Sequence, residues 1–201
     1  MELILVRHAL PVRIDATADG SPADPGLSEL GHRQAGRLVQ ALEYDPIDVF
    51  YCSPARRALE TAAPVAAALG VDLVVEADIA EFDAAHNSYV PVEELRAAGD
   101  PRWDRLVKGD LYHPDVDPEA FRSRVIAGVE RIAVAHPGGR AVLFTHSGVI
   151  NAYSSMVLDQ SRMLWFAPAY ASINRIGASR DGRRGVISLN ETGHVRDLLS
   201  P

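Results

Sequence analysis

The sequence predicts an α/β fold, a three-layer α/β/α sandwich around a mostly parallel mixed sheet. Short apolar runs, which suit buried strands, alternate along the chain with longer segments of helical periodicity. Two strand-like runs near the end, 171–179 and 185–190, are joined by a turn-like polar segment and predict one antiparallel hairpin. The length of 201 residues suits one domain, and no repeat or linker divides residues 1–201.

The first half of the chain is expected to contain three buried strands. They are short apolar runs bounded by polar or turn residues, at 2–6, 48–52 and 71–76. Residues 10–26 are rich in Pro, Asp and Gly, so they are predicted to form a loop between the first strand and the first helix.

Two helices are predicted between these strands. The first follows Ser28, a plausible N-cap, and four small or apolar residues recur on one face: Gly31, Ala35, Leu38 and Leu42. In the second helix Ser53 is the expected cap, Pro54 the first helical residue and Gly70 the C-cap. Pro64 lies inside this helix and should bend it, because proline has no backbone N–H.

The second half begins with residues 77–117, whose periodicity is weak and which contain several prolines and glycines. We expect this segment to be an irregular, variable insertion. A helix is predicted over 118–136, where a glycine pair follows, and a fourth buried strand over 141–145. His146 comes directly after that strand and precedes another predicted helix.

Composition narrows the classes of partner. The formal net charge is -7, which opposes a general attraction to nucleic acid or to an anionic membrane. The single cysteine, Cys52, excludes an internal disulfide and fits a reducing cytoplasm, where we expect the protein to reside. The N-terminal apolar run is too short to span a membrane, so no membrane partner is expected.

Polar residues follow three of the predicted strands at their carboxyl ends. Arg7 and His8 follow the first strand, Arg56 and Arg57 come shortly after the second, and His146 follows the fourth. Because ligands gather at the carboxyl ends of strands in such sheets, we expect these groups to converge there. Two imidazoles with guanidinium groups would form an anion pocket, and the planar fork of arginine can bond two phosphate oxygens at once.

Each of these residues alone has a structural explanation. A histidine after a strand is more often a hydrogen-bonded structural residue than a catalyst, and paired arginines on the first turn of a helix are usually solvated. Their common placement at strand ends is what favours a binding pocket for an anion.

Six segments, taken in order, resemble the landmarks of the histidine phosphatase superfamily, the phosphoglycerate-mutase-like group (branch 1). They are LVRHA, LSELGHRQA, CSPARRALETA, AEFD, VLFTHSG and ISLNETGH. The resemblance implies a phosphoglycerate-mutase-like fold with the insertion 77–117 on the substrate side. It also implies a metal-independent phosphatase that needs no cofactor and hydrolyses a small phosphorylated metabolite.

The resemblance also implies roles for individual residues. His8 would be the nucleophile that becomes phosphohistidine, and Arg7 and Arg57 would hold the phosphate. His146 matches the second histidine of the family, which binds the transferred phosphoryl group and stabilises charge in the transition state. Glu81 matches the proton donor to the leaving oxygen.

Some assignments are less direct. Asp83 is a competing acid, because it stands two residues after Glu81. Arg13 lies beside the position where the family often has an asparagine that binds phosphate, and we expect it to contact substrate instead. His86 and His113 fall in the insertion and are further candidates for substrate contact.

Several alternatives stay open. A cofactor-dependent phosphotransferase of the mutase type would use the same residues, but such mutases resemble longer chains. A non-catalytic member that binds a phospho-ligand is disfavoured because both histidines, the arginine and the acid are present. A metal-dependent phosphohydrolase could use His8, His146 and Glu81, but there is no HExxH or His-x-His pattern, and two guanidinium groups would oppose a cation. A homodimer through an edge strand is a further expectation.

Overall fold

The protein is described by a computed structural model over residues 1–111, 113 and 115–199. Within these residues, six strands form one sheet in the order β3-β2-β4-β1-β5-β6. The strands are β1 (Glu2–Arg7), β2 (Val49–Cys52), β3 (Leu73–Val75), β4 (Arg140–Thr145), β5 (Ile173–Ala178) and β6 (Arg184–Glu191). The first four are parallel, whereas β5 is antiparallel to β1 and β6 is antiparallel to β5. The prediction of a mostly parallel mixed sheet is confirmed.

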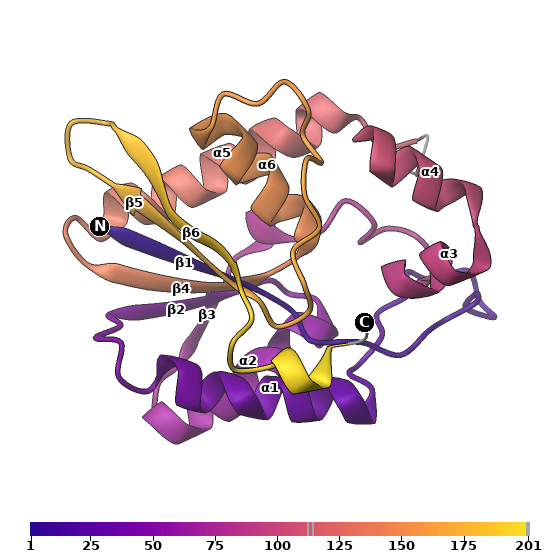
Figure 1. Cartoon of the computed structure of the whole chain (residues 1–201), viewed down its shortest axis with the longest axis horizontal. Coiled ribbons are helices and arrows are strands. Elements are labelled where there is room, and N and C mark those ends of the chain that lie inside the picture. The colour runs from indigo at the N-terminus through magenta and orange to yellow at the C-terminus, as the bar shows by residue number, and fades with distance from the viewer. Residues whose placement is uncertain (112, 114, 200–201) are drawn as a thin grey trace.

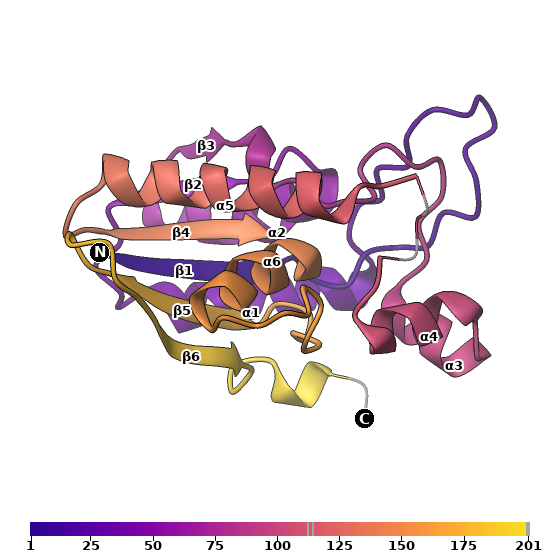
Figure 2. The ribbon, with the colours of Figure 1, turned by 90° about the horizontal axis from the view of Figure 1, so that it is seen from above.

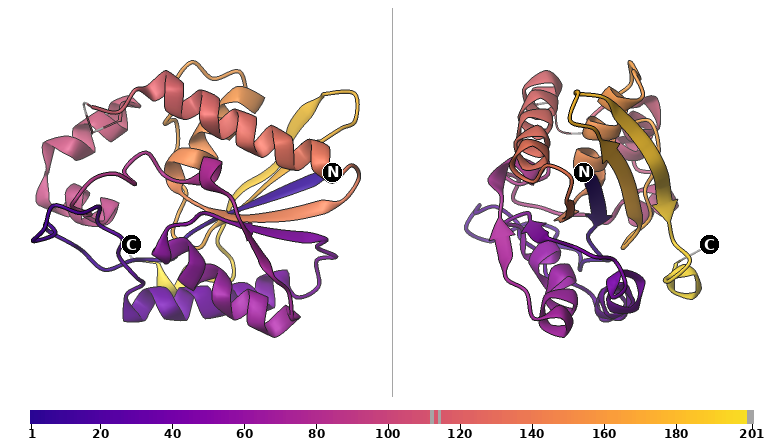
Figure 3. Two further views of the ribbon diagram at one scale, coloured as in Figure 1. Left: turned by 180° about the vertical axis from the view of Figure 1, so that it is seen from behind. Right: turned by 90° about the vertical axis from the view of Figure 1, so that its left-hand side faces the viewer.

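Helices cover both faces of this sheet. In Figure 1, α1 (Glu29–Leu42) and α2 (Arg56–Leu69) lie below it, and α5 (Pro118–Ala135) and α6 (Ser147–Val157) lie above it. The end-on view in Figure 3 shows the sheet between the two helix pairs. The predicted three-layer sandwich is therefore confirmed.

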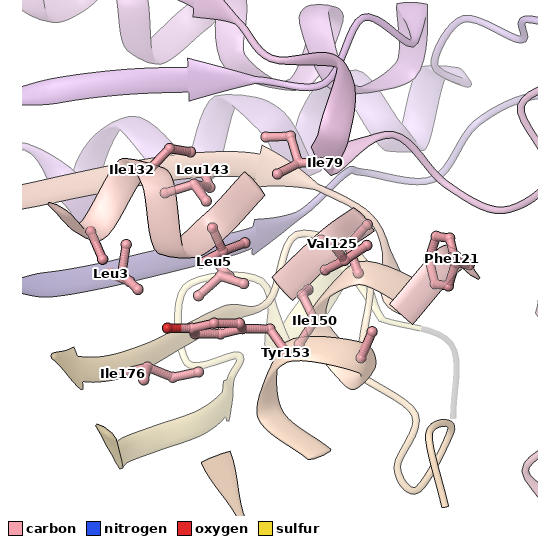
Figure 4. Packing of buried hydrophobic residues seen from close by; sticks show 14 of the residues in the cluster. Leu3, Leu5, Ile79, Phe121, Val125, Ile132, Leu143, Ile150, Tyr153 and Ile176 are labelled. Carbon is pink, nitrogen blue, oxygen red and sulfur yellow. The ribbon is translucent and has the colours of Figure 1, made fainter. Parts of the chain in front are cut away.

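Alternation along the strands explains the two hydrophobic cores. Leu3 and Leu5 of β1 pack in the cluster beneath α5 and α6, whereas Ile4 and Val6 pack in the cluster with α1 and α2. Successive side chains of a strand point to opposite faces, so an unbroken apolar run such as this one buries both faces. Figure 4 shows the first cluster, with Tyr153 of α6 beside the sheet.

The first predicted helix is confirmed at its start. The Ser28 hydroxyl accepts a hydrogen bond from the backbone N–H of Gly31 at 3.0 Å, as an N-cap does. Gly31 also lies against the preceding loop, because a Cβ atom there would be 2.0 Å from the carbonyl oxygen of Leu10. A glycine is therefore required at this crossing.

The second helix begins later than predicted. Its first residue is Arg56 and its N-cap is Ala55, so the prediction of Ser53 as cap and Pro54 as first helical residue is wrong. The Ser53 hydroxyl instead hydrogen-bonds His146, and the exposed N–H of Arg56 donates to Asp24 of the preceding loop at 2.8 Å. The carboxylate of the loop replaces the expected serine cap.

The far end of α2 is as predicted. Gly70 ends the helix in the left-handed conformation with φ of 63°, which favours glycine. Pro64 lies within α2, as expected.

The insertion 77–117 is more regular than predicted. It contains a 3₁₀ turn η1 (Ala77–Ile79) and two helices, α3 (Val92–Ala98) and α4 (Pro101–Lys108). Both helices end at a left-handed glycine, Gly99 and Gly109. Figures 1 and 2 show α3 and α4 beyond the carboxyl ends of the parallel strands, to one side of the sheet. The expectation of an irregular segment is therefore wrong over 92–108.

The predicted terminal hairpin is present as β5 and β6, and a last 3₁₀ turn, η2 (Arg196–Leu198), follows it. The sheet edges are β3 and β6, and a homodimer through one of them stays a prediction. Cys52 is a free thiol buried in the core. Of the helices in the described ranges, none combines the length and the apolar character that a membrane crossing needs.

Candidate active site

The predicted residues meet at the carboxyl end of the sheet. Arg7 ends β1 and His8 follows it, and Arg57 lies in the first turn of α2. Together with Glu81 and Asp83, which follow η1, these residues line one cavity of about 220 Å³. All five are buried. Charged groups are seldom buried to this extent unless they have partners or a function.

His8 is held in one tautomer. Its Nδ1 lies 2.8 Å from the carbonyl oxygen of Ala9, and because a carbonyl only accepts, Nδ1 carries the proton. The lone pair is therefore on Nε2. Burial, followed by the positive charges of Arg57 and Arg7, lowers the pKa of His8 well below its usual value. The imidazole is therefore neutral at neutral pH, as a nitrogen nucleophile must be.

His146 lies beside His8 but is not among the residues that line the cavity. The two ring centroids are 5.2 Å apart, and the His146 ring is fully buried. Its Nε2 hydrogen-bonds the Ser53 hydroxyl at 2.7 Å. Burial and then the charge of Arg57 lower the pKa of His146 well below its usual value. When the hydroxyl donates to Nε2, the proton of the neutral ring is on Nδ1.

The two arginines are each fixed on one side only. Arg7 donates from Nη1 to the carbonyl oxygen of Pro168 at 2.6 Å and lies over the ring of Tyr170, 3.7 Å from its centroid. Arg57 donates from Nη2 to Asp83 at 3.0 Å. Within the described residues, Arg57 is the only one of these two cations with an ion pair. Arg7 has no carboxylate within ion-pair distance in the described residues, although, against the effect of burial, the charges of Glu93 and Glu81 act on it and raise its pKa.

Three buried nitrogen atoms of this cluster have no hydrogen-bond partner in the part of the chain that the structure describes. They are Nε of Arg7, Nε of Arg57 and Nδ1 of His146. Buried polar groups are nearly always hydrogen-bonded, so three unpaired ones in one cluster indicate that a ligand satisfies them. Two of them are N–H groups of cations, and such donors suit an anionic ligand.

Glu81 can supply a proton at neutral pH. Burial, followed by the charge of Asp83, raises the pKa of Glu81 to about 7. The carboxyl group accepts hydrogen bonds from the backbone N–H of Gly148 at 2.8 Å and of Phe82 at 3.1 Å. A Cβ atom on residue 148 would lie 2.2 Å from Oε1 of Glu81. Glycine at the start of α6 is therefore what allows the carboxyl group to occupy this place.

The segment that carries Glu81 is anchored from two sides. The Thr145 hydroxyl donates to the carbonyl oxygen of Ile79 at 2.8 Å. Arg124 of α5 donates to three carbonyl oxygens of η1 and its C-cap residue, those of Ala77, Asp78 and Ala80. These bonds fix the position of Glu81 relative to the strand ends.

Asp83, the competing acid, has a different place. Its carboxylate is paired with the buried guanidinium of Arg57. This carboxylate is already committed to holding the guanidinium of Arg57, at 3.0 Å from Nη2. The geometry therefore favours Glu81 as the acid.

Arg13 and His86 do not line the cavity, although both were expected to contact substrate. Arg13 is half exposed and forms ion pairs with Asp15 and Glu94. Arg56, the neighbour of Arg57, is likewise exposed and pairs with Glu60 at 2.6 Å.

His86 belongs to the one group among the described residues that could hold a metal ion. Its ring stacks on that of His113, and its Nε2 lies 3.0 Å from a carboxylate oxygen of Asp115. The ligand atoms of these three residues all lie within 4.8 Å of one another. Burial and the neighbouring His86 lower the pKa of His113 to about 4. None of the three lines the cavity.

Sequence reasoning missed three positioning contacts. The Thr61 hydroxyl accepts from the backbone N–H of Ala9 at 2.9 Å and donates to the carbonyl oxygen of Arg57 at 2.6 Å. It thereby ties the segment after β1 to the first turn of α2. Tyr89 lies under Arg57, 4.8 Å from its guanidinium carbon, and Tyr170 lies under Arg7. Thr61 stands in the quoted CSPARRALETA segment, whereas no local pattern marks the two tyrosines.

Sequence reasoning also missed the rest of the cavity wall, which is mostly apolar. The wall includes Phe82, Tyr89, Val90, Val92, Trp103, Leu106, Val107, Leu164, Trp165, Phe166, Ala167 and Pro168. Its polar members beyond the five residues named above are Ser147, Asn151 and Arg162, apart from the backbone at Gly148.

Comparison with known families gives one match over nearly the whole chain. The sequence model of the histidine phosphatase superfamily (branch 1) matches residues 3–192.

Two curated relatives match most of this chain but differ in their own length. Phosphoserine phosphatase 1 of Hydrogenobacter thermophilus is 30% identical over 98% of this chain and 96% of that protein. A bifunctional protein of Mycobacterium tuberculosis is 28% identical over 96% of this chain. The chain spans about half, 54%, of the length of that relative.

Solved structures share the fold. A mycobacterial glucosyl-3-phosphoglycerate phosphatase superposes with a TM-score of 0.74 at 21% identity, covering 94% of this chain and 98% of that one. A variant of the phosphoserine phosphatase of Entamoeba histolytica, in complex with phosphoserine, superposes with a TM-score of 0.73 at 20% identity, covering 96% and 98%. At these identities the likeness establishes the fold alone.

Proposed function

The chain belongs to branch 1 of the histidine phosphatase superfamily, and from this premise we propose that it hydrolyses a small phosphomonoester through a phosphohistidine on His8. One observation carries the proposal. Nε of Arg7, Nε of Arg57 and Nδ1 of His146 are buried without partners among the described residues, and they lie beside a neutral His8. A phosphoryl group would satisfy all three, and phosphoryl transfer depends mainly on such positioning and charge neutralisation.

In the first step, Nε2 of His8 attacks phosphorus while the bond between phosphorus and the leaving oxygen breaks. The protonated Glu81 gives its proton to that oxygen, so the alcohol leaves neutral. Arg7 and Arg57 hold the oxygens of the phosphoryl group, and His146 donates to them. The carbonyl of Ala9 keeps the His8 ring oriented by accepting from Nδ1.

In the second step, water attacks phosphorus and the bond to Nε2 breaks. The Glu81 carboxylate takes a proton from the water, inorganic phosphate leaves, and His8 returns to its neutral form. The two steps use the same acid in opposite directions, as a covalent mechanism allows. A pKa of about 7 for Glu81 suits both directions near neutral pH.

The relatives support this class of substrate. The name of the relative from Hydrogenobacter thermophilus says that it acts on phosphoserine, a small phosphomonoester. We propose that the substrate of this chain is likewise a small phosphorylated metabolite. We also propose that the protein acts in the cytoplasm, where the free thiol of Cys52 would stay reduced. The mechanism needs no metal ion and no cofactor.

The proposal is tested by trapping the intermediate. A reaction with a ³²P-labelled phosphomonoester, run with a chelator and quenched in alkali, should leave label on the protein that is lost in acid. The His8→Ala change should remove the label and lower turnover by about 10⁴-fold or more, as loss of a covalent nucleophile does. The exposed His32 provides a matched control, because His32→Ala should leave both unchanged.

Three outcomes would contradict parts of the proposal. Full activity in His8→Ala would rule out His8 as nucleophile. Activity that disappears with the chelator and returns with a divalent ion would favour a metal-dependent reaction. Transfer of the label to added phosphoglycerate in preference to water would indicate a mutase.

A further inference from the structure

We propose that the substrate is the phosphate ester of an aromatic alcohol, and not of an amino acid that carries an ammonium group. The inference rests on the proposed phosphatase function, because it concerns the part of the cavity that would hold the leaving group. The phosphate end of the cavity is made by Arg7, His8 and Arg57, so the leaving group must extend along the remaining wall.

That wall concentrates the aromatic residues of the chain. Both tryptophans of the sequence, Trp103 and Trp165, line it, together with Phe82, Tyr89 and Phe166. They come from three separate segments: the stretch after η1, helix α4 and the stretch after α6. Aromatic rings are large apolar surfaces that stack on other rings with defined geometry. Aromatic side chains from three segments on one wall suit a flat, apolar ligand.

Helix α4 is the clearest sign of an apolar ligand. Trp103, Leu106 and Val107 are spaced i, i+3 and i+4, so they lie on one face of the helix, and all three line the cavity. No residue of α4 is buried, and 55% of Val107 is exposed. An amphipathic helix normally covers its apolar face with protein core. Here only Leu106 of the three also packs against the core, and the face borders the cavity, where an apolar ligand would cover the rest of it.

The part of the wall that follows α6 is held in position by hydrogen bonds within the protein. The side chain of Asn151 accepts from the backbone N–H groups of Trp165 at 2.9 Å and Phe166 at 3.1 Å, and it donates to the carbonyl oxygen of Phe166. The indole N–H of Trp165 donates to the Ser154 hydroxyl at 3.2 Å. The rings of Trp165 and Phe166 lie 4.5 Å apart. Their positions are therefore set without a ligand, which lowers the entropic cost of binding one.

The polar groups of the wall do not suit a charged amino acid. Glu81 and Asp83 are the carboxylates among the described lining residues, and one serves as the acid while the other is paired with Arg57. An ammonium group on the leaving group would find neither of them uncommitted. Asn151 is also committed, to the backbone at Trp165. A buried charge without a partner is strongly disfavoured, so a phosphoserine-like leaving group should bind poorly.

The test compares esters whose leaving alcohols have similar acidity. We expect kcat/KM for 2-naphthylmethyl phosphate and benzyl phosphate to exceed that for O-phosphoserine and glycerol 3-phosphate by at least about 100-fold. Trp103→Ala and Trp165→Ala should lower kcat/KM for 2-naphthylmethyl phosphate about 10–100-fold more than for glycerol 3-phosphate. Trp103→Phe should restore most of this selectivity, which guards against a folding defect. Val134→Ala, at an exposed apolar position of α5 away from the cavity, is the matched control.

A binding measurement separates this inference from the proposed function. Because both tryptophans line the cavity, 2-naphthylmethyl phosphate should change the tryptophan fluorescence of the His8→Ala protein, whereas O-phosphoserine should not. Efficient turnover with a preference for O-phosphoserine would overturn the inference and leave the phosphatase function intact. Binding of the naphthyl ester without hydrolysis by the wild-type protein would overturn the phosphatase function, while it would support an aromatic ligand in this cavity. If the protein neither binds nor hydrolyses that ester, the inference is overturned.

Discussion

The phosphate end and the apolar wall of the cavity are built in different ways. At the phosphate end, Arg7, His8 and Arg57 lie at or near strand ends, and none is more than 5% exposed. The apolar wall depends on α4, in which no residue is buried, and on the stretch 162–168 after α6. A helix outside the sheet can change without disturbing the strands, whereas the strand ends cannot. From this difference we propose that the sheet fixes the reaction and that the insertion selects the substrate.

Supporting contacts reinforce the difference. Hydrogen bonds through the backbone of Ala9 connect His8 to Thr61, and Thr61 in turn bonds the carbonyl oxygen of Arg57. These bonds join the end of β1 to helix α2. On the other side, Arg162 donates to the carbonyl oxygen of Val107 at the end of α4 and lies close to Gly109. Substitutions at the phosphate end should therefore affect every substrate, and those in the wall should affect substrates unequally.

Among substitutions of cavity residues other than His8, the largest effect is expected at Glu81. The Glu81→Gln change should slow turnover of alkyl phosphates by about 10²–10⁴-fold, because an amide cannot donate the proton that the leaving oxygen needs. The loss should be equal for aromatic and polar alcohols, since the acid acts at the phosphate end. It should be smaller for 4-nitrophenyl phosphate, whose leaving group needs no proton. Steady-state kinetics with the three kinds of ester measures this.

Asp83 provides the matched control for Glu81. Asp83→Asn keeps an oxygen that can accept from Arg57 but removes its charge, so it should weaken phosphate positioning for all esters alike. If Asp83→Asn spares 4-nitrophenyl phosphate and Glu81→Gln does not, Asp83 is the acid and the assignment of Glu81 is wrong.

The pH dependence is the next largest effect. Burial raises the pKa of Glu81 to about 7, so the acid is protonated below this pH and loses its proton above it. In the free enzyme, kcat/KM for alkyl phosphates should therefore fall about tenfold per pH unit above 7, or about 100-fold by pH 9. The fall should be shallower for 4-nitrophenyl phosphate. An equal fall for both kinds of ester would mean that the titrating group is not the acid.

The sequence predicts the phosphate end well for a physical reason. Strand β1 is a continuous apolar run, so its end is visible in the sequence, and parallel neighbours must bring their ends to the same edge. The convergence of Arg7, His8, Arg57 and His146 follows from topology. The roles of these residues came from the family resemblance, because position alone does not separate a nucleophile from a structural histidine.

The apolar wall escaped prediction although local signals for α4 were present. Asp100 caps the helix, Pro101 is its first residue and Gly109 ends it in the left-handed conformation. The helix has only eight residues, so its one-sided apolar pattern covers little more than two turns and is too short to stand out in a segment with several prolines and glycines. The prediction of Ser53 as an N-cap was wrong for a different reason. A serine before a helix predicts a cap, but here its hydroxyl hydrogen-bonds His146, a residue distant in sequence.

A smaller effect is expected at Gly148, where the acid meets α6. A Cβ atom there would lie 2.2 Å from Oε1 of Glu81, so Gly148→Ala must displace the carboxyl group. We expect a loss of about tenfold in kcat for alkyl phosphates, with the optimum pH shifted because the backbone N–H no longer reaches the carboxylate. Gly36→Ala in α1 is the matched control, since nothing lies within 4 Å of its Cβ position and activity should not change. An unchanged pH profile in Gly148→Ala would contradict the positioning role.

The smallest effect is expected at Arg13, which was predicted from sequence to contact substrate. Arg13 does not line the cavity, and its ion pairs with Asp15 and Glu94 are half exposed, so they contribute little. The neighbouring loop is held without it, because the backbones of Ile14 and Tyr89 exchange two hydrogen bonds at 2.9 and 2.7 Å. Tyr89, which does line the cavity, should therefore keep its place in Arg13→Ala.

We expect kcat/KM of Arg13→Ala to change by less than about twofold for both aromatic and polar esters, as exposed substitutions usually do. Arg37→Ala removes an equally exposed arginine that pairs with Asp197 and is the matched control. A loss above about tenfold that is confined to polar or anionic esters would mean that Arg13 turns into the cavity when such a substrate binds. The insertion side would then recognise charge as well as apolar surface, and the simple division between the two ends of the cavity would fail.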